Sequence, residues 1–499
     1  MLWLGLHFPA LAQEVFHLGE SLRDEDPAEA LAGATAPRVA EPRVIVEDNR
    51  VVLCNAAALN AGIVQGCTLA TAHSIVSGLR HHQREPEREA RRLRQLGEML
   101  YRFSAHISLA SPSGLILEAG GSLRLFGDVA ALAQQVEALC GSLGHEVCCR
   151  WAKTPLAALL LARSRAAQID EVPLSCMNLN ADQVERFANM GIYSLGQLLS
   201  LPRQSVARRF GQHLVDELQR LSGTLPDPQS CLQPAHQFHH DLHLLEPIHS
   251  KEALLFPMQR LLIELHHWLV GRQLGAELLV WHFAAAGGHP ERRLRLPVSF
   301  ARPQQHQESF LGITRLRLDQ AELPDDVMSI GLEARRLQPW SADSRLLFQQ
   351  LPGEAGGAWR ARELEDLVDE LRARLGRSAC CSIEALDQHC PENAWTRAPL
   401  SNRRSTNQRR SANQRRSASG AVQPAPAALP PTRPLWLFEP PRAMAPEKLT
   451  LLRGPERIQA GWWQEGQCRD YYVARHEDGA ECWAFVDAHD RWYLHGYFA

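Results

Sequence analysis

The chain has 499 residues, of which 45% are hydrophobic and 22% are charged, and its formal net charge is -3 at pH 7. This length exceeds what one hydrophobic core supports and predicts roughly three or four domains. The small net charge excludes a global attraction to nucleic acid, so any binding of that kind requires local basic patches.

Cysteine usage and the amino terminus indicate the compartment. The 12 cysteines include no Cys-x-x-Cys motif, and their spacing fits neither a disulfide framework nor a zinc ribbon. The first residues resemble a secretory signal that ends at Ala10-Leu11-Ala12, but His7 and Pro9 interrupt them and no Lys or Arg precedes them. We therefore expect reduced thiols, no signal peptide, no membrane span and a cytoplasmic location.

The first predicted element is a buried strand over residues 2–6 that leads into a helix from about Ala10. Such a turn is a usual place for metal-binding carboxylates, yet no acid occurs before Glu14. Further strands are predicted at residues 44–46, 51–53 and 115–118, and further helices after Asn55 and over residues 129–142. This order predicts an α+β sheet domain with helices on one face.

The order and spacing of these elements resemble the palm and fingers of Y-family (translesion) DNA polymerases, and in particular the polymerase-like subunits of bacterial mutagenesis complexes. Gly5 and His7 stand where the first acidic motif of that family has two aspartates. Ser113 and Gly114 stand where the second motif has a paired Asp-Glu. The resemblance thus covers both acidic motifs while their acids are missing.

The positions that hold the incoming nucleotide in the family are replaced as well. Asn55 and Ala58 occupy the places of a Tyr and an Arg in the fingers, and Pro155 occupies that of a Lys after the last palm strand. Two-metal phosphoryl transfer requires carboxylates that hold two cations about 3.5–4 Å apart, and Gly, Ser or a single His does not hold hard Mg²⁺. Glu118 is the nearest acid, and by itself it does not restore two metals. We therefore predict a polymerase-like fold with no catalysis, no bound metal and no cofactor, with an active polymerase that uses unusual ligands as the alternative.

Residues 178–223 are predicted to form four short helices, in the position of the polymerase thumb. The helices are separated at Met190-Gly191-Ile192 and at Arg209-Phe210-Gly211. The first turn, an apolar residue, Gly and an apolar residue before a helix opened by Ser194, has the helix-hairpin-helix pattern, in which the next helix presents free N–H groups to a backbone phosphate. A plain helical bundle is the alternative. The predicted DNA contacts in this segment are Gly191, Ile192, Ser194, Arg203, Arg209 and Gly211.

Along residues 236–333 the spacing of apolar residues switches between that of strands and that of helices in the order of a βαββαβ unit. This segment resembles the little finger domain. Arg293 and Arg295 alternate with Leu294 and Leu296, which predicts a strand with one basic face toward DNA phosphates and one face packed inward. A basic edge that opposes aggregation is the alternative reading.

Four histidines at the start of this unit invite a zinc assignment: His236, His239, His240 and His243. No cysteine or acid occurs at a suitable spacing on the predicted strand, and the turn of a metal knuckle is missing. We therefore predict that these are surface histidines.

Two short peptides resemble sliding-clamp ligands, which end in Leu-Phe and usually begin with Gln. The first consists of Ser344, Arg345, Leu346, Leu347 and Phe348, with Ser in the place of Gln, and the second covers residues 434–438. For either peptide, an ordinary pair of core residues is the alternative.

The rest of the chain completes a six-part organisation. An amphipathic helix is predicted over residues 361–375, a six-residue repeat with six arginines and no acid begins at residue 401, and the aromatic-rich end predicts a small antiparallel β module. The predicted parts are palm and fingers at 1–170, thumb at 171–232, little finger at 233–345, a clamp-motif and helix region at 346–400, a disordered linker at 401–433, and the β module at 434–499.

The resemblance implies a function and a set of partners. It implies a non-catalytic DNA-binding hub of error-prone translesion synthesis in SOS mutagenesis, associated with the nucleoid. The implied partners are primer-template DNA, the sliding clamp, the RecA-like protein ImuA and an error-prone homologue of the polymerase III alpha subunit. A DNA-binding protein with no role in replication is a further alternative.

Overall fold

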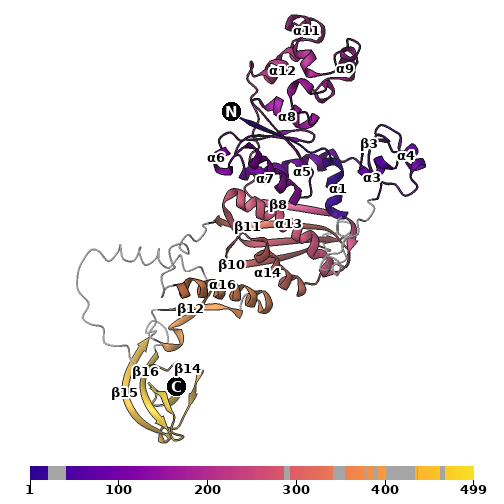
Figure 1. Ribbon diagram of the computed structural model, residues 1–499. Helices are drawn as coiled ribbons and strands as arrows, with labels where there is room; N and C mark the ends of the chain where they lie inside the picture. Colours follow the sequence, from indigo (N-terminus) through magenta and orange to yellow (C-terminus); the bar gives the residue numbers. More distant parts are fainter. Residues whose placement is uncertain are drawn as a thin grey trace, which may run out of the picture. The chain divides into compact units, whose positions relative to one another are not determined.

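The computed structural model describes residues 1–20, 41–285, 293–340, 355–376, 379–386, 390–399, 433–434, 436–460 and 467–498. The chain divides into two compact units, Met1–Arg374 and Leu375–Ala499 (Figure 1). Several sheets and many helices alternate along it, so the predicted α+β multidomain class is confirmed. Within the described ranges, no helix is long and apolar enough to cross a membrane.

The centre of the first unit is an antiparallel sheet of four strands, β1 (Trp3–His7), β5 (Ile107–Ala110), β6 (Gly114–Glu118) and β7 (Cys148–Ala152). Their order is β5-β6-β1-β7, so the strand predicted at the amino terminus is an inner strand of the sheet. Leu4 and Leu6 are completely buried on one face of β1. The helices on that face are α1 (Leu11–Glu20), α5 (Pro86–Met99) and α7 (Val129–Ser142), with the short α6 (Leu123–Phe126) before α7.

The expectation that helices cover one face of this sheet is wrong. Helix α8 (Pro155–Ser164) lies on the opposite face, over β1 and β7. The close approach is possible because Gly5 and Gly114 have no side chain toward it. The sheet is therefore enclosed between two helical layers.

A second, smaller sheet corresponds to the predicted fingers. It consists of β2 (Arg43–Glu47), β3 (Arg50–Cys54) and β4 (Arg80–Gln83) in the order β3-β2-β4, together with α3 (Ala56–Asn60) and α4 (Leu69–Ile75). Asp48 and Asn49, between β2 and β3, have φ values of 47° and 63°, as a tight hairpin turn requires. The helices and the sheet share a core of their own around Val44, Val46 and Ala58.

The four short helices predicted after residue 178 are present. They are α9 (Ala181–Ala188), α10 (Leu195–Leu199), α11 (Arg203–Phe210) and α12 (Gln212–Ser222). Their shared core includes Phe187, Leu195 and Leu214, and also Leu160 and Leu161 of α8. Helix α8 therefore joins this bundle to the central sheet.

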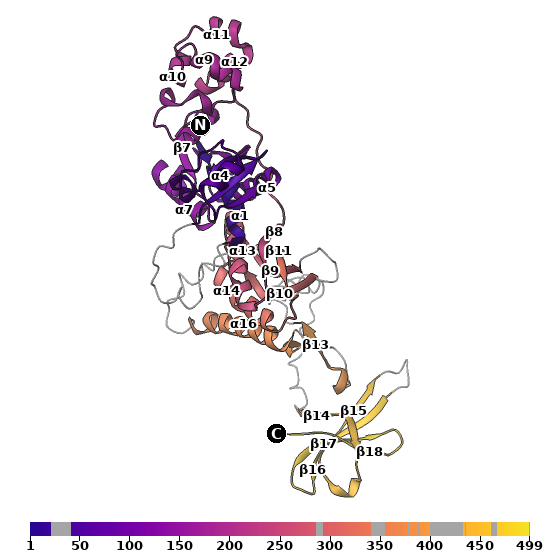
Figure 2. The ribbon, with the colours of Figure 1, turned by 90° about the vertical axis from the view of Figure 1, so that its right-hand side faces the viewer.

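The predicted βαββαβ unit is confirmed. Its elements are β8 (Phe238–Ile248), α13 (Lys251–Arg272), β9 (Leu274–Ala285), β10 (Arg293–Gln304), α14 (Gln307–Asp319) and β11 (Val327–Pro339), and its strand order is β10-β9-β11-β8. Helices α13 and α14 cover one face of this sheet (Figures 1 and 2). The core between the layers contains Trp268, Trp281 and Phe310, and the other face of the sheet carries charged side chains.

Helix α16 (Ala355–Leu375) is held against the edge strand β10, because the Oδ1 atom of Asp369 accepts a hydrogen bond of 2.7 Å from the backbone N–H of Ala301. Asp369 is only 3% exposed, and burial raises its pKa to about 7 even though that hydrogen bond lowers it. Leu364 and Leu367 remain exposed. The helix thus docks on its own chain, and a buried carboxylate is part of that contact.

The second unit contains the hairpin β12 (Cys381–Ala385) and β13 (Trp395–Pro399) and a five-stranded sheet. The strands of that sheet are β14 (Trp436–Ala443), β15 (Leu449–Ala460), β16 (Gln467–His476), β17 (Glu481–Asp487) and β18 (Trp492–Tyr497), in the order β14-β18-β17-β16-β15. Tyr471, Trp483 and Phe485 are buried together in it, with the rings of Tyr471 and Trp483 stacked at 4.0 Å. These aromatics therefore form a core, while Trp436 on the edge strand β14 is exposed.

A buried chain of charged and polar groups joins the central sheet domain to the βαββαβ unit. Arg92 of α5 donates from Nη1 to Oε1 of Glu264 on α13 and from Nε to Nε2 of His145, at 2.7 and 2.8 Å. Two more hydrogen bonds extend this chain: Nδ1 of His145 lies 2.7 Å from Oε2 of Glu14, and Nδ1 of His240 lies 2.7 Å from Oε2 of Glu264. Because His145 accepts from Arg92, its ring is neutral, consistent with burial and Arg92 lowering its pKa to about 4.

The position of His240 corrects the expectation of four surface histidines. Its side chain is 5% exposed and is bonded to Glu264, which is 1% exposed. The sequence does not reveal this pairing because the two residues lie on different elements that meet only across the core of the βαββαβ unit.

We predict that Glu264→Gln lowers the free energy of unfolding by about 3–5 kcal/mol, because it leaves Arg92 buried without a counter-charge. Burial alone raises the pKa of Glu264, but Arg92 and His240 outweigh this and hold it below its usual range. The contribution is therefore present at neutral pH and is lost as the pH falls through the folded-state pKa. Urea unfolding followed by tryptophan fluorescence measures it. The exposed Gln259→Ala on the same helix should change stability by less than about 0.5 kcal/mol, and an equal effect of both variants would contradict the prediction.

Candidate nucleic-acid interface

The four residues that replace the acidic motifs lie together on the central sheet. In the antiparallel register of β1 and β6, His7 is opposite Gly114 and Gly5 is opposite Ile116. The Oγ atom of Ser113 lies 3.3 Å from Nδ1 of His7. The structure thus places the residues predicted to stand at the first acidic motif beside those predicted to stand at the second.

The backbone of α8 occupies the space beside this group. A β-carbon on Gly5 would lie 2.2 Å from the carbonyl oxygen of Ala158 and 2.6 Å from the backbone nitrogen of Leu159. A β-carbon on Gly114 would lie 2.7 Å from Cδ1 of Leu159. Any side chain at position 5, a carboxylate included, would therefore have to displace the helix.

The local sequence explains why α8 begins where it does. Thr154 caps the helix by accepting a hydrogen bond from the backbone N–H of Ala157, and its hydroxyl donates to the carbonyl of Leu221 on α12. Pro155 is buried in the first turn, where a missing N–H is harmless. The residue that replaces a family Lys therefore serves to start the helix that covers the sheet.

The charge around His7 is positive. Burial, followed by the nearby guanidinium of Arg163 and that of Arg165, lowers the pKa of His7, and a hydrogen bond with the backbone of Ser113 opposes the shift. The Nη2 atom of Arg163 donates to the carbonyl of Ser111 at 3.3 Å, which holds it near this edge of the sheet. Two arginines beside a neutral imidazole make a poor environment for a pair of divalent cations.

Glu118 lies at the opposite end of β6 from the replaced acids. It is paired with Trp3, four positions beyond Gly114, or about 13 Å along the strand. Its Oε1 atom accepts a hydrogen bond of 3.2 Å from the backbone N–H of Gly120. This geometry opposes the alternative in which Glu118 substitutes for the missing metal ligands.

Both fingers residues that replace nucleotide-binding groups have structural contacts. The Oδ1 atom of Asn55 accepts hydrogen bonds from the backbone N–H groups of Ala58 and Arg43, at 2.8 and 3.0 Å, and its Nδ2 atom donates to the carbonyl of Glu41. Ala58 is completely buried in the fingers core. Asn55 therefore caps α3, and neither residue presents a group to a triphosphate.

The predicted helix-hairpin-helix residues lie on two neighbouring turns of the helical bundle. Gly191 and Gly211 have φ values of 75° and 94°, which a residue with a β-carbon rarely adopts. Ser194 caps α10 by accepting from the backbone N–H of Gln197, and Ile192 packs against the bundle core. Arg209 extends toward the first turn, with Nη1 3.7 Å from the sulfur of Met190.

The bundle therefore presents a basic surface beside its turns. Gly191, Arg203, Arg209 and Gly211 are all exposed. Helix α10 has only five residues, so its dipole is small, and the arginine charges provide most of the attraction for a phosphate.

The solvent face of the βαββαβ sheet carries the other predicted DNA contacts. Arg293 and Arg295 are exposed on the edge strand β10, while Leu296 on the alternate face is buried. Arg335 of β11 is a further exposed arginine on this face, and sequence analysis did not identify it. In the sequence, only the alternation of side chains along β11 pointed to Arg335. Its proximity to Arg293 and Arg295 depends on the order of the strands, which the sequence does not give.

The first clamp-motif candidate, residues 344–348, lies outside the described residues. In the second, Leu437 and Phe438 belong to β14 and pack against the two cores of the five-stranded sheet. Phe438 also lies under the guanidinium of Arg442 and beside the ring of Tyr497. The structure thus favours the core-pair explanation for the second peptide.

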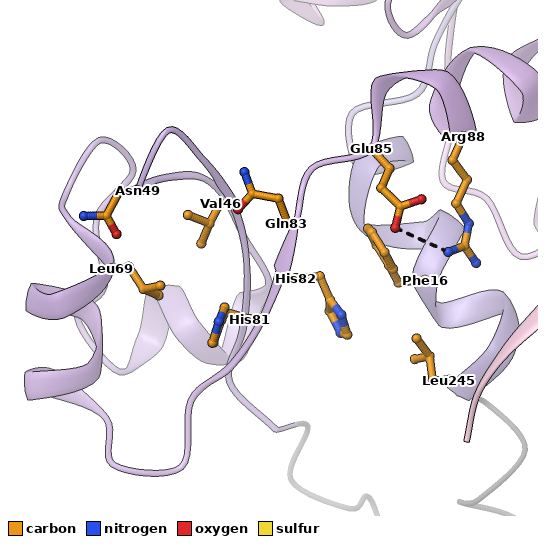
Figure 3. A pocket seen from close by; sticks show the side chains of 10 residues that line it. All are labelled: Phe16, Val46, Asn49, Leu69, His81, His82, Gln83, Glu85, Arg88 and Leu245. Atoms are coloured by element: carbon orange, nitrogen blue, oxygen red, sulfur yellow. Dashed lines mark ion pairs between the residues drawn. The ribbon is translucent and has the colours of Figure 1, made fainter. Parts of the chain in front are cut away.

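A cavity of about 470 Å³ opens between the fingers sheet and helices α1 and α5 (Figure 3). The rings of Phe16 and His82 stack at 4.6 Å, and the guanidinium of Arg88 lies 5.0 Å from the centre of the Phe16 ring. No motif indicated this cavity, because its lining comes from several separate elements. The lining residues are Phe16, Val46, Asn49, Leu69, His81, His82, Gln83, Glu85, Arg88 and Leu245.

Comparison with known proteins agrees with this architecture. Residues 33–163 match the impB/mucB/samB family, so this segment is similar to that family. Over 489 aligned residues the chain is 25% identical to Protein ImuB of Caulobacter vibrioides, from strains NA1000 / CB15N and ATCC 19089 / CIP 103742 / CB 15, and the match covers 88% of this chain and 100% of each relative. The chain is thus similar to ImuB along most of its length.

Solved structures also align with the chain. The Dbh ternary complex and DinB from Sulfolobus solfataricus are each 13% identical to it, with a TM-score of 0.36. Each alignment covers 67% of this chain and 98% of the solved chain.

We predict that Gly5→Ala lowers the free energy of unfolding by about 1–3 kcal/mol or more, because the new methyl group meets the backbone of α8. Gly121→Ala is the matched control, since a β-carbon there meets nothing within 4 Å. Urea unfolding of both variants beside the unaltered chain measures the difference. A Gly5→Ala variant as stable as the control would show that α8 is not closely packed on β1.

Proposed function

We propose that the chain is a non-catalytic, DNA-binding subunit of an error-prone translesion synthesis complex of SOS mutagenesis. The similarity to known proteins supports a DNA-damage-related, polymerase-like protein. We add the proposal that this protein does not catalyse DNA synthesis. The observation that carries this proposal is the packing of α8 on Gly5, because it takes the space that a metal-binding side chain would need.

Two surfaces support DNA binding. The glycine turns and arginines of the helical bundle and the arginines of β10 are exposed, and both surfaces suit contact with backbone phosphates rather than base edges. A primer-template duplex is the DNA form we propose, by analogy with the polymerase fold. The chain would thus bind DNA as a polymerase does, while another protein carries out the synthesis.

The proposed partners follow from the similarity to ImuB. They are the sliding clamp, the RecA-like protein ImuA and an error-prone homologue of the polymerase III alpha subunit, and the proposed location is the cytoplasm, at the nucleoid. We propose the same domain division as the sequence analysis, with the palm and fingers, thumb and little finger ending near residues 170, 232 and 345. The clamp-binding peptide would then follow the little finger directly.

We predict that the purified chain extends no primer with Mg²⁺ or Mn²⁺, and that extension appears only when an active polymerase partner is added. A primer-extension assay with labelled primer and all four deoxynucleotides measures this. Incorporation by the chain alone that Glu118→Ala abolishes would support the alternative of an active polymerase with unusual ligands, and would overturn our proposal.

We predict that affinity for primer-template DNA falls steeply with salt, because phosphate contacts release counterions. Arg209→Ala and Arg293→Ala should each weaken binding several-fold and reduce the slope of log affinity against log salt by about 1. Fluorescence anisotropy over about 50–200 mM salt measures both quantities. Arg315→Ala on α14, on the opposite side of the little finger sheet, is the matched control and should bind normally. Binding that does not depend on salt would contradict contacts led by phosphates.

We predict that changing both Leu347 and Phe348 to Ala abolishes capture of the chain by an immobilised bacterial sliding clamp. Ser344→Gln should strengthen capture, since clamp ligands usually begin with Gln. A pull-down that is indifferent to both changes would favour the other candidate function, a DNA-binding protein with no role in replication.

A further inference from the structure

Two histidines and a carboxylate meet on the solvent face of the little finger sheet. They are His239 of β8, His282 of β9 and Glu333 of β11, and their ligand atoms all lie within 4.8 Å of one another. In the register of the sheet, Glu333 is directly opposite His239, while His282 is opposite Gly331, two residues before Glu333. Three adjacent strands thus supply one potential ligand each.

From this geometry we propose that the little finger sheet contains a zinc site with His239, His282 and Glu333 as protein ligands. The sequence indicated no metal here, because the carboxylate that completes the set of ligands does not belong to the first strand. The acid comes from a strand about ninety residues further along the chain, and only the strand order places it beside the histidines.

The donor set fits zinc better than magnesium or calcium. Two imidazoles and one carboxylate, with a fourth position open to solvent, are a usual zinc environment, whereas Mg²⁺ and Ca²⁺ prefer oxygen ligands. With bonds of about 2.0–2.2 Å, tetrahedral ligands lie about 3.4 Å apart. The Nε2 atom of His282 and the Oε2 atom of Glu333 already lie 3.4 Å apart.

His239 is the ligand that would move. Its side chain is 54% exposed, compared with 29% for His282 and 15% for Glu333. A shift of about 1.4 Å at most brings its ligand atom from within 4.8 Å of the other two to the spacing that a tetrahedral site requires. Two ligands are therefore held by the sheet, and the third can close on the ion.

The surroundings of Glu333 and His282 leave one atom of each side chain available to bind an ion. The Nε atom of Arg335 donates to Oε1 of Glu333 at 2.6 Å, which leaves Oε2 for the ion. Among the described residues, the buried Nε2 atom of His282 has no hydrogen-bond partner of good geometry.

Asp241 adds a second negative charge at the site. The Oδ2 atom of Asp241 lies 3.2 Å from Nε2 of His239. A β-carbon on Gly331 would lie 2.2 Å from Oδ1 of Asp241. The carboxylate of Asp241 can therefore occupy this position only because residue 331 has no side chain. The charges of Asp241 and Glu333 offset those of the nearby Arg295 and Arg335, so the four side chains together do not repel a divalent ion.

The site does not depend on the proposed DNA-binding role, although the two share a surface. Arg295 is directly opposite His282 in the register of β9 and β10. A bound ion would therefore add positive charge to the face that carries Arg293 and Arg295. Zinc binding can be tested without DNA, so failure of one proposal leaves the other intact.

The test is titration of the full-length chain, freed of metal with a chelator, with Zn²⁺ by isothermal calorimetry. We expect a site that is weakened at least tenfold by His282→Ala and by the nearly isosteric Glu333→Gln. His243→Ala is the matched control, because His243 is exposed on the same strand, four residues from His239, opposite Ser329, and should bind normally.

Two further readouts separate this site from zinc held by the free cysteines. Zn²⁺ should raise the thermal unfolding temperature of the chain and of His243→Ala, but not that of His282→Ala or Glu333→Gln. Co²⁺ should give visible absorption without the intense near-ultraviolet bands of cobalt–thiolate bonds. Absence of zinc binding, or binding that survives both ligand variants, would overturn the proposal.

Discussion

The packing of α8 against β1 is the contact on which the arrangement of the first unit depends. The helix backbone lies where a side chain of residue 5 would stand, and the helix also contributes leucines to the core of the helical bundle. One element therefore closes the sheet on one side and anchors the bundle on the other. Gly at this position is thus a packing requirement of the sheet and α8.

A second constraint acts on the other side of the sheet, where the buried chain from Glu14 to His240 links the central domain to the little finger. Each member is hydrogen-bonded to the next, so separating the two domains would expose a charged pair that has lost its partner. This network gives geometric specificity to the contact that apolar packing alone would not provide.

The solvent face of the little finger sheet carries two kinds of side-chain groups. Its helix-covered face is an ordinary apolar core, and its solvent face combines arginines with histidines and carboxylates. The arginines at the β10 edge are suited to phosphates, while the inner strands bring together nitrogen and oxygen donors suited to a borderline metal ion. The two features are adjacent because antiparallel pairing places residues of distant sequence in register.

Much of the local structure could be predicted from sequence, because local patterns determine it. The hairpin at Asp48 and Asn49, the four helices of the bundle and the βαββαβ order follow from turn residues and from the spacing of apolar side chains, which act over a few positions. The prediction that Gly5, His7, Ser113 and Gly114 stand at the positions of the family's acids also came from the sequence, since it needs only a comparison of positions along the chain.

What the sequence alone determined was therefore the order of the elements and the absence of acids at the two motifs. Only the tertiary structure decided that α8 covers Gly5, that His240 is buried beside Glu264, and that His239 lies within reach of His282 and Glu333. These contacts join residues that are tens to more than a hundred positions apart, and no local preference specifies them. They arise because burial of the apolar faces sets which helix lies on which sheet and which strands are neighbours, and the polar side chains are brought together as a result.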